Sequence, residues 1–162
     1  ACVSALILCG ITMTRTSEID WLYRGIAPLF PAQWKRFHMG VPSEKRDGDL
    51  VEAYFELLHN LDPLIRQEAS RNWHAWEAAS LSINADHEVQ PELIDQRFEL
   101  ARARIVTHYF RHAAWLEDGI LLKNADKLAN IPGVMVQGRM DLAAPMVTAW
   151  ELAQAWPSPD IA

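Results

Sequence analysis

Ile131-Pro-Gly-Val-Met-Val-Gln-Gly-Arg-Met-Asp-Leu-Ala-Ala-Pro145 is the stretch of the sequence that decides the fold. Its apolar centre, Val134 to Val136, predicts a short buried strand, and Pro145 predicts the start of a final helix. Asp141 follows the strand closely, and α/β enzymes place functional groups at the carboxyl ends of parallel strands. An aspartate that caps the turn before the helix fits the same pattern equally well. Both roles therefore stay open for Asp141 on the local pattern.

A second strand is predicted near the start of the sequence. Residues 3–13 are apolar, partly β-branched and interrupted by Gly10, which is typical of a strand buried on both faces of a parallel sheet. The same run could indicate a signal peptide or a membrane anchor. However, it lacks a basic segment in front and is too short to span a bilayer. A buried strand fits it better.

Most of residues 16–130, between the two strands, carry helical signals. Capping residues and prolines predict five helix starts, at Ser17, Pro31, Asp47 or Asp49, Asp62-Pro63, and Pro91. The fourth helix should run to about Leu81, and a short helix is expected at residues 125–129. The fold class is therefore a predominantly α-helical α/β protein, with helices between two short parallel strands and a helix at the end.

The longest helix is expected from Pro91 to about Trp115, after a polar loop at residues 84–90. The periodicity of its apolar residues predicts a buried stripe, formed by Phe98, Ala101, Ile105 and Tyr109. Two parallel strands do not form a stable sheet alone. Further strands or another chain are therefore expected to complete the sheet.

Composition and charge narrow the classes of function. The 162 residues are enough for one domain, half of them are apolar and 22% are charged, which argues for a globular protein and against disorder. The net charge of −6 argues against a nucleic-acid surface, because phosphate contact needs a basic patch. A solvated helix face is the expected role of the arginine cluster formed by Arg97, Arg102, Arg104 and Arg111.

The two cysteines predict a reducing environment. On one extended strand, Cys2 and Cys9 would lie roughly 23 Å apart, at ~3.3 Å per residue. A disulfide needs Cα atoms within about 7 Å. We therefore expect free thiols and a cytoplasmic location.

His108 and His112 are four residues apart on the longest predicted helix, with Glu117 a turn beyond. That spacing could serve a shared metal ion. The glutamate that follows the first histidine in zinc proteases is absent, and both histidines flank the apolar stripe. Helix packing or surface exposure is the expected role, with no metal and no other cofactor.

Eight short motifs are distributed in order over nearly the whole sequence. They are Gly10-Ile11, Ser17-Glu-Ile-Asp-Trp21, Leu29-Phe-Pro31 with Trp34, Gly48-Asp-Leu50 with Ala53-Tyr54, Trp73-His-Ala-Trp-Glu77, Ala103-Arg-Ile105 with His108-Tyr-Phe110, Gly138-Arg-Met-Asp141 with Pro145, and Ala149-Trp150 with Ala155-Trp-Pro157. Their order and spacing resemble the proline iminopeptidases (prolyl aminopeptidases) of the α/β-hydrolase superfamily. The resemblance implies a sheet strand in residues 1–15 and a helical, substrate-recognising cap domain in residues 16–130. It implies an adjacent strand, the triad-acid loop and the last helix in residues 131–162.

The resemblance also implies roles for single residues. Asp141 matches the acid of the catalytic triad, which orients and stabilises the histidine. Glu77 matches an acid that holds the amino group of the substrate, with Trp76 beside it and Phe110 as the retained aromatic. A surface acid near a helix end is the alternative for Glu77.

Four positions depart from the family pattern. A second amine-binding acid of the family falls at Val106, and an arginine before Gly10 falls at Cys9. An expected aromatic falls at Thr12, and an expected cysteine falls at Ala144. These departures predict a weakened preference for proline.

The nucleophile and the base of the family do not occur in the sequence. None of the seven serines has a glycine two residues away on either side, as the Gly-x-Ser-x-Gly turn requires. The last histidine is His112, whereas the family base follows the acid. We therefore expect a truncated hydrolase, inactive alone, whose parent reaction releases an N-terminal residue, preferably proline, from peptides. A stand-alone, non-catalytic protein that binds or oligomerises is the alternative.

The expected partners follow from these features. A peptide or a small amine-bearing ligand would fit the pocket that the resemblance implies. A second copy of the chain or a complementing chain would cover the exposed sheet and the underside of the cap. Neither nucleic acid nor a membrane is expected as a partner.

Overall fold

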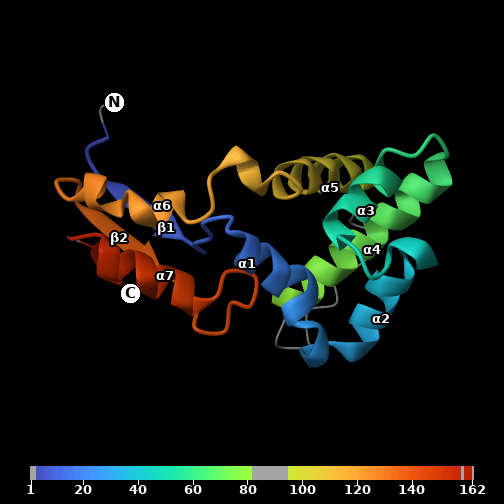
Figure 1. Ribbon diagram of the computed structural model, residues 1–162, viewed down its shortest axis with the longest axis horizontal. Helices are drawn as coiled ribbons and strands as arrows, with labels where there is room; N and C mark the ends of the chain where they lie inside the picture. Colours follow the sequence, from blue (N-terminus) through green and yellow to red (C-terminus); the bar gives the residue numbers. More distant parts are fainter. Residues whose placement is uncertain (1–2, 82–94, 158, 162) are drawn as a thin grey trace.

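The computed structural model describes residues 3–81, 95–157 and 159–161. A small parallel sheet lies at one end of an elongated molecule and a cluster of helices lies at the other, with α1 (Thr16–Asp20) between them (Figure 1). The sheet end also contains α6 (Ile120–Lys123), the short η6 (Ala125–Leu128) and α7 (Met146–Ala155). The predicted fold class, helices between two parallel strands and a final helix, is confirmed.

Within these described residues, the sheet has three parallel strands in the order β1 (Leu6–Cys9), β2 (Gly133–Val136) and β3 (Pro159–Ile161). The expected pairing of the first two strands is confirmed, with Leu6 opposite Gly133 and Cys9 opposite Val136. β1 is shorter than expected because Gly10 adopts a left-handed conformation, with φ +59°, directly after Cys9. The sequence did not predict β3, because prolines disfavour strands except at edges, and Pro159 lies on the edge strand.

One face of the sheet is covered and the other is open. On the covered face, Met135 is fully buried against Ala149, Leu152 and Trp156 of the α7 region. On the open face, Ile7 is 76% exposed, and Val134 and Val136 are also exposed. This alternation follows from side chains pointing to opposite faces along a strand.

The helical end begins with α1, which continues as η1 (Trp21–Gly25) and η2 (Ala27–Leu29). It then contains α2 (Pro31–Met39), η3 (Ser43–Lys45), α3 (Leu50–Leu58), α4 (Pro63–Leu81) and α5 (Gln96–Phe110). The predicted starts at Pro31 and Pro63 are confirmed. Of the two candidate caps for α3, Asp49 is the one used, because its side chain accepts hydrogen bonds from the Val51 and Glu52 amides.

Stacked aromatic side chains form the core of the helical end. Phe37 stacks on Tyr54 with ring centroids 4.5 Å apart, and Tyr23 stacks on Trp73 at 4.6 Å. Trp73 is fully buried. Aromatic packing of this kind stabilises a core beyond the area that it buries.

The predicted boundaries of the longest helix were wrong. α5 begins at Gln96, after the extended N-cap Asp95, and ends at Phe110. α4, with 19 residues, is longer. Beyond Phe110 the chain turns through η5 (Ala113–Trp115), where three successive residues have positive φ and no helix can continue. The polar loop expected at residues 84–90 lies outside the described residues.

The predicted buried stripe of α5 was also wrong. Phe98 is 66% exposed, Ile105 is 60% exposed and Tyr109 is 49% exposed, and Ala101 is exposed as well. The face that packs against α3 and α4 instead carries the fully buried Ala103 and Thr107, together with the half-buried Leu100, Val106 and Phe110. Small side chains let these helices approach closely, so the contact follows size as well as hydrophobicity.

The free-thiol prediction can be compared with the structure at Cys9. Cys9 carries a free thiol and is exposed, whereas Cys2 lies outside the described residues. In the part of the chain that the structure describes, no helix is long and apolar enough to cross a membrane.

Candidate functional site

Asp141 lies in the turn that follows β2, beside the end of β1. Its Oδ1 atom accepts hydrogen bonds from the backbone amides of Ala143 and Ala144, at 3.0 and 2.9 Å. Its Oδ2 atom lies next to Gly10, where an added Cβ would be 3.8 Å away. The carboxylate therefore caps its own turn, and it also stands at the carboxyl ends of two adjacent parallel strands. The sequence presented these two placements as alternatives, whereas the structure combines them.

Gln137 positions the loop that carries Asp141. Its buried side chain accepts a hydrogen bond from the Ile11 amide at 2.8 Å and donates one to the Ala144 carbonyl at 2.6 Å. It thereby joins the chain after β1 to the loop after β2. Sequence analysis missed Gln137, because a single polar residue after a strand gives no signal of a contact 126 residues away.

Glu77, on α4, is engaged by groups of the same chain. Its Oε1 atom accepts a hydrogen bond from the Tyr23 hydroxyl at 3.2 Å. Its Oε2 atom forms an ion pair with the guanidinium of Arg102, on α5. Only 12% of the Glu77 side chain is exposed. The charge that such burial would penalise is therefore compensated within the protein.

Tyr23 donates to Glu77 as a neutral phenol. Burial raises the pKa of the Tyr23 hydroxyl well above its usual value, and the negative charge of Glu77 raises it further. The hydroxyl therefore stays protonated and acts as a hydrogen-bond donor to the carboxylate. The ring of Tyr23 stacks on Trp73 and fixes the hydroxyl in place.

His74 completes the cluster around Glu77. Its Nδ1 atom lies 3.1 Å from Nη1 of Arg102, and its Nε2 atom lies 2.8 Å from the carbonyl of Glu99. Arginine can only donate and a carbonyl can only accept, so His74 accepts at Nδ1 and donates at Nε2. This pattern defines a neutral imidazole. The 3.7 Å contact of Nδ1 with Glu77 is therefore no ion pair.

Trp76 and Phe110 occupy different environments. Trp76 is 1% exposed, and its indole N–H donates to the carbonyl of Leu22 at 3.0 Å. It belongs to the aromatic core, where it stacks on Phe37. Phe110 is half-buried, and its ring centroid lies 6.0 Å from that of Tyr23.

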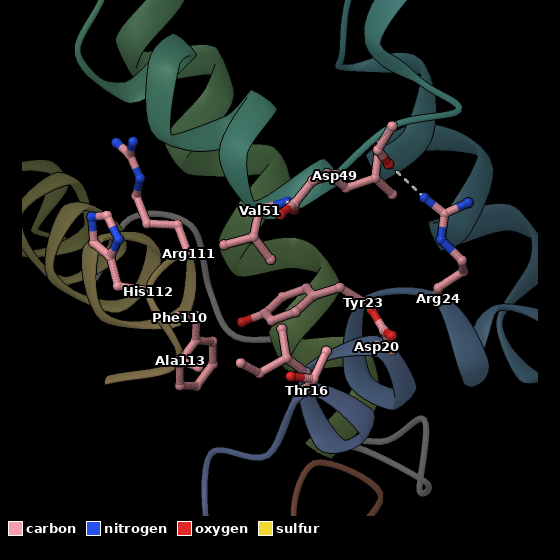
Figure 2. A pocket seen from close by; sticks show the side chains of 13 residues that line it. Thr16, Asp20, Tyr23, Arg24, Asp49, Val51, Phe110, Arg111, His112 and Ala113 are labelled. Atoms are coloured by element: carbon pink, nitrogen blue, oxygen red, sulfur yellow. Dashed lines mark hydrogen bonds between the residues drawn. The ribbon is translucent and has the colours of Figure 1, made fainter. Parts of the chain in front are cut away.

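Phe110 and Tyr23 line an open pocket of about 560 Å³. The pocket lies between the α1 and η1 region, the start of α3 and the end of α5, and Figure 2 shows the Tyr23 ring near its centre. Its charged lining residues are Asp20, Arg24, Asp49 and Arg111, and His112 adds an imidazole. Glu77, Trp76 and Asp141 are not among the lining residues. The structure therefore does not gather the four predicted site residues in this pocket.

Three of the four arginines expected on a solvated helix face make tertiary contacts. Arg102 pairs with Glu77, Arg104 donates to the Leu58 carbonyl at 2.9 Å, and Arg111 pairs with Glu52 at 2.8 Å. Glu77 lies on α4, and Leu58 and Glu52 lie on α3. The sequence shows the arginines but not which helices face them.

His108, near the end of α5, and His112, just beyond it, contact aromatic rings. His112 stacks on Trp115 with centroids 4.8 Å apart, and the rings of His108 and His112 are 5.7 Å apart. Among the residues that the structure describes, no group of three or more histidine, cysteine, aspartate or glutamate side chains is arranged to hold a metal ion.

Comparison with known proteins finds proline iminopeptidases among the relatives of this chain. The chain is 38% identical over 161 residues to a proline iminopeptidase of Arabidopsis thaliana, which covers 98% of this chain and 42% of the relative. It is 39% identical over 158 residues to a probable proline iminopeptidase of Leptolyngbya boryana, covering 96% of this chain and 49% of the relative. This chain is a partial homologue of the proline iminopeptidases.

A Neisseria gonorrhoeae proline iminopeptidase shows the same proportions, with 37% identity over 98% of this chain and 51% of the relative. The chain thus spans about half the length of the curated relatives that it matches. No protein-family model matches it. The similarity to proline iminopeptidases inferred from the eight motifs is confirmed.

Proposed function

We propose that this chain is the cap and triad-acid part of a proline-iminopeptidase-type α/β-hydrolase. The parent reaction is the release of an N-terminal residue, preferably proline, from a peptide. The observation that carries the proposal is the position of Asp141 at the carboxyl ends of the paired strands β1 and β2, where α/β enzymes hold catalytic groups.

In such a hydrolase Asp141 would orient a histidine. Its Oδ1 atom is held by two backbone amides. Its Oδ2 atom accepts one long hydrogen bond, from the Gln137 amide at 3.5 Å, and would also accept one from the imidazole N–H and stabilise the imidazolium that forms during catalysis. The histidine and the serine nucleophile would be supplied by polypeptide outside these 162 residues. Without them there is no acyl-enzyme route, so we propose that this chain alone is inactive.

Glu77 would serve as a ligand for the substrate amine. It lies on α4 beside Trp73 and Trp76, and its carboxylate is mostly shielded from water. A shielded carboxylate attracts a cation more strongly than an exposed one does. Phe110, in the neighbouring pocket, would contact the apolar part of the ligand. We also propose a cytoplasmic location, which the free thiol of Cys9 supports.

Two assays test the proposal. Alone, the chain should not hydrolyse proline p-nitroanilide or p-nitrophenyl acetate above background. A chimera, in which this chain replaces the matching segment of the Leptolyngbya boryana relative, should hydrolyse the ester. Turnover by the isolated chain, or an inert but folded chimera, would contradict the proposal.

The open face of the sheet supports a second candidate function, self-association without catalysis. Ile7, Val134 and Val136 expose an apolar face, and in the described part of the chain no strand pairs with the outer edge of β1. Exposed faces and edges of this kind favour association with another surface. A second copy of the chain would cover the apolar face and pair with the edge of β1.

Size-exclusion chromatography with light scattering tests this candidate. It predicts a dimer that dissociates when Ile7, which is 76% exposed, is changed to lysine. The matched control is Leu61→Lys, because Leu61 is 97% exposed but lies far from the sheet, between α3 and α4. A wild-type chain that stays monomeric at high concentration would exclude self-association.

A further inference from the structure

Both oxygens of the Glu77 carboxylate are engaged by this chain. The Tyr23 hydroxyl donates to Oε1 at 3.2 Å, and the Arg102 guanidinium pairs with Oε2. The Glu77 side chain is 12% exposed, whereas that of Arg102 is 42% exposed. The carboxylate is thus shielded and its cationic partner lies nearer to solvent, so a ligand that approaches Glu77 from that side meets Arg102.

His74 holds Arg102 in this position. The same Nη1 atom of Arg102 that pairs with Glu77 also donates to Nδ1 of His74, at 3.1 Å. His74 is itself anchored to the Glu99 carbonyl at 2.8 Å. Contacts with two side chains reduce the freedom of an otherwise flexible arginine.

The cluster carries no surplus negative charge. Glu77 supplies one negative charge, Arg102 supplies one positive charge, and His74 and Tyr23 are neutral by their hydrogen-bond pattern. One turn beyond Arg102 on α5, Val106 packs against the aromatic core and adds no charge. An ammonium group would therefore find its carboxylate neutralised and a guanidinium in its path.

We propose that Arg102 is a built-in competitor for the amine site, so that the charged N-terminus of a ligand must displace the guanidinium from the Glu77 carboxylate and binds more weakly for that reason. The inference rests on the proposed role of Glu77 as the amine ligand. The guanidinium takes the place on the Glu77 carboxylate that the ammonium of a ligand would take. Arg102 is thus a specificity-determining residue that lowers the affinity of the site for charged amines.

Calorimetric titration of the whole chain tests the inference with two probes. L-prolinamide carries a charged amine, and N-acetyl-L-prolinamide is its uncharged counterpart. Arg102→Met should bind prolinamide about two- to fivefold more tightly than the wild type, the factor expected for releasing one partly exposed ion pair. Its affinity for N-acetylprolinamide should not change.

Three further variants separate charge from shape. Arg102→Lys keeps the positive charge and should behave like the wild type. Adding Glu77→Gln to Arg102→Met should abolish the gain. Adding His74→Gln instead should preserve the gain, because the amide can still donate to the Glu99 carbonyl and cannot replace the lost cation. Circular dichroism verifies that each variant is folded.

Several results would overturn the inference. They are equal prolinamide affinity of wild type and Arg102→Met, an equal gain for both probes, or a gain in Arg102→Lys. None of them depends on catalysis. If the chimera hydrolyses the ester while Arg102→Met leaves prolinamide binding unchanged, only this inference fails. If Arg102→Met gains affinity for the amine while the chimera is inert, only the catalytic proposal fails.

Discussion

Glu18 fixes the start of α1 on the sheet end of the molecule through its buried carboxylate. Its Oε2 atom accepts hydrogen bonds from the Met13 and Arg15 amides, and its Oε1 atom accepts from the Thr148 hydroxyl at 2.7 Å. The Arg15 guanidinium also pairs with Glu18 and extends to Glu151. These partners come from the segment after β1 and from α7, so the start of α1 is fixed on the sheet end.

Stability should depend on pH through Glu18. Burial raises its pKa, but hydrogen bonds from Thr148, Arg15 and Met13 outweigh burial and hold the pKa below its usual value. The folded state then gains stability above the unfolded pKa, and this gain is lost as the pH falls through the lower folded pKa. We expect Glu18→Gln to cost about 1.5–3 kcal/mol of unfolding free energy at pH 7 and much less at pH 3.

Urea unfolding at the two pH values measures this difference. Glu117→Gln serves as the control, because the Glu117 side chain is 71% exposed and its loss should change stability little at either pH. A cost of Glu18→Gln that is the same at pH 7 and pH 3 would show that the carboxylate contributes nothing through its charge.

Single residues were predictable from the sequence where a motif marks them. Asp141 and Glu77 were found because each lies within a recognisable motif. The sequence alone predicts a solvated helix face for Arg102. Its pairing with Glu77 joins α5 to α4 across 25 residues, and no local pattern encodes which helices meet. The contact of Gln137 with Ile11 was not predictable for the same reason.

α5 shows at the level of one element why hydrophobic pattern alone misplaced a helix face. The predicted stripe follows the largest apolar side chains, yet Ile105 is exposed and Ala103 is fully buried against α3 and α4. Tight packing between three helices requires small side chains at the contact. The prediction failed because it weighted hydrophobicity and ignored volume.

Enlarging Ala103 should therefore be costly. Ala103→Leu should lower the unfolding free energy by about 1–3 kcal/mol through overpacking. Ile105→Ala changes the side-chain volume on the same helix by a similar amount in the opposite direction, but it should stay within about 0.5 kcal/mol of the wild type, since Ile105 is 60% exposed. Urea denaturation of the two variants measures both costs in unfolding free energy. A larger cost for Ile105→Ala than for Ala103→Leu would contradict the observed packing face and support the predicted stripe.

The start of α3 distinguishes two aspartates that the sequence left open. Asp49→Ala should cost about 1 kcal/mol of unfolding free energy, because it removes the acceptor for the Val51 and Glu52 amides. Asp47→Ala is the matched control, two residues away and exposed, and should be nearly neutral. Thermal unfolding of both variants measures the difference, and equal effects would rule out Asp49 as the cap.

At the scale of the whole molecule, the described residues form two separate hydrophobic clusters, one among the helices and one at the sheet. The strand–helices–strand order was predictable from the sequence, and the resemblance to proline iminopeptidases implied that the two strands are neighbours. The third strand was not predictable, because its pairing with β2 depends on a return of the chain that two prolines obscure. The open sheet face likewise became visible only in three dimensions.

The identity of Asp141 as a triad acid is tested most directly by kcat for ester hydrolysis in the chimera. Asp141→Asn is the informative variant, because asparagine can still cap the turn through the Ala143 and Ala144 amides but cannot stabilise an imidazolium. We expect kcat to fall about ten-thousand-fold, while Asp126→Asn, at an exposed aspartate of η6, leaves it unchanged. Full turnover by the Asp141→Asn chimera would show that Asp141 only caps its turn, and would contradict the proposed function.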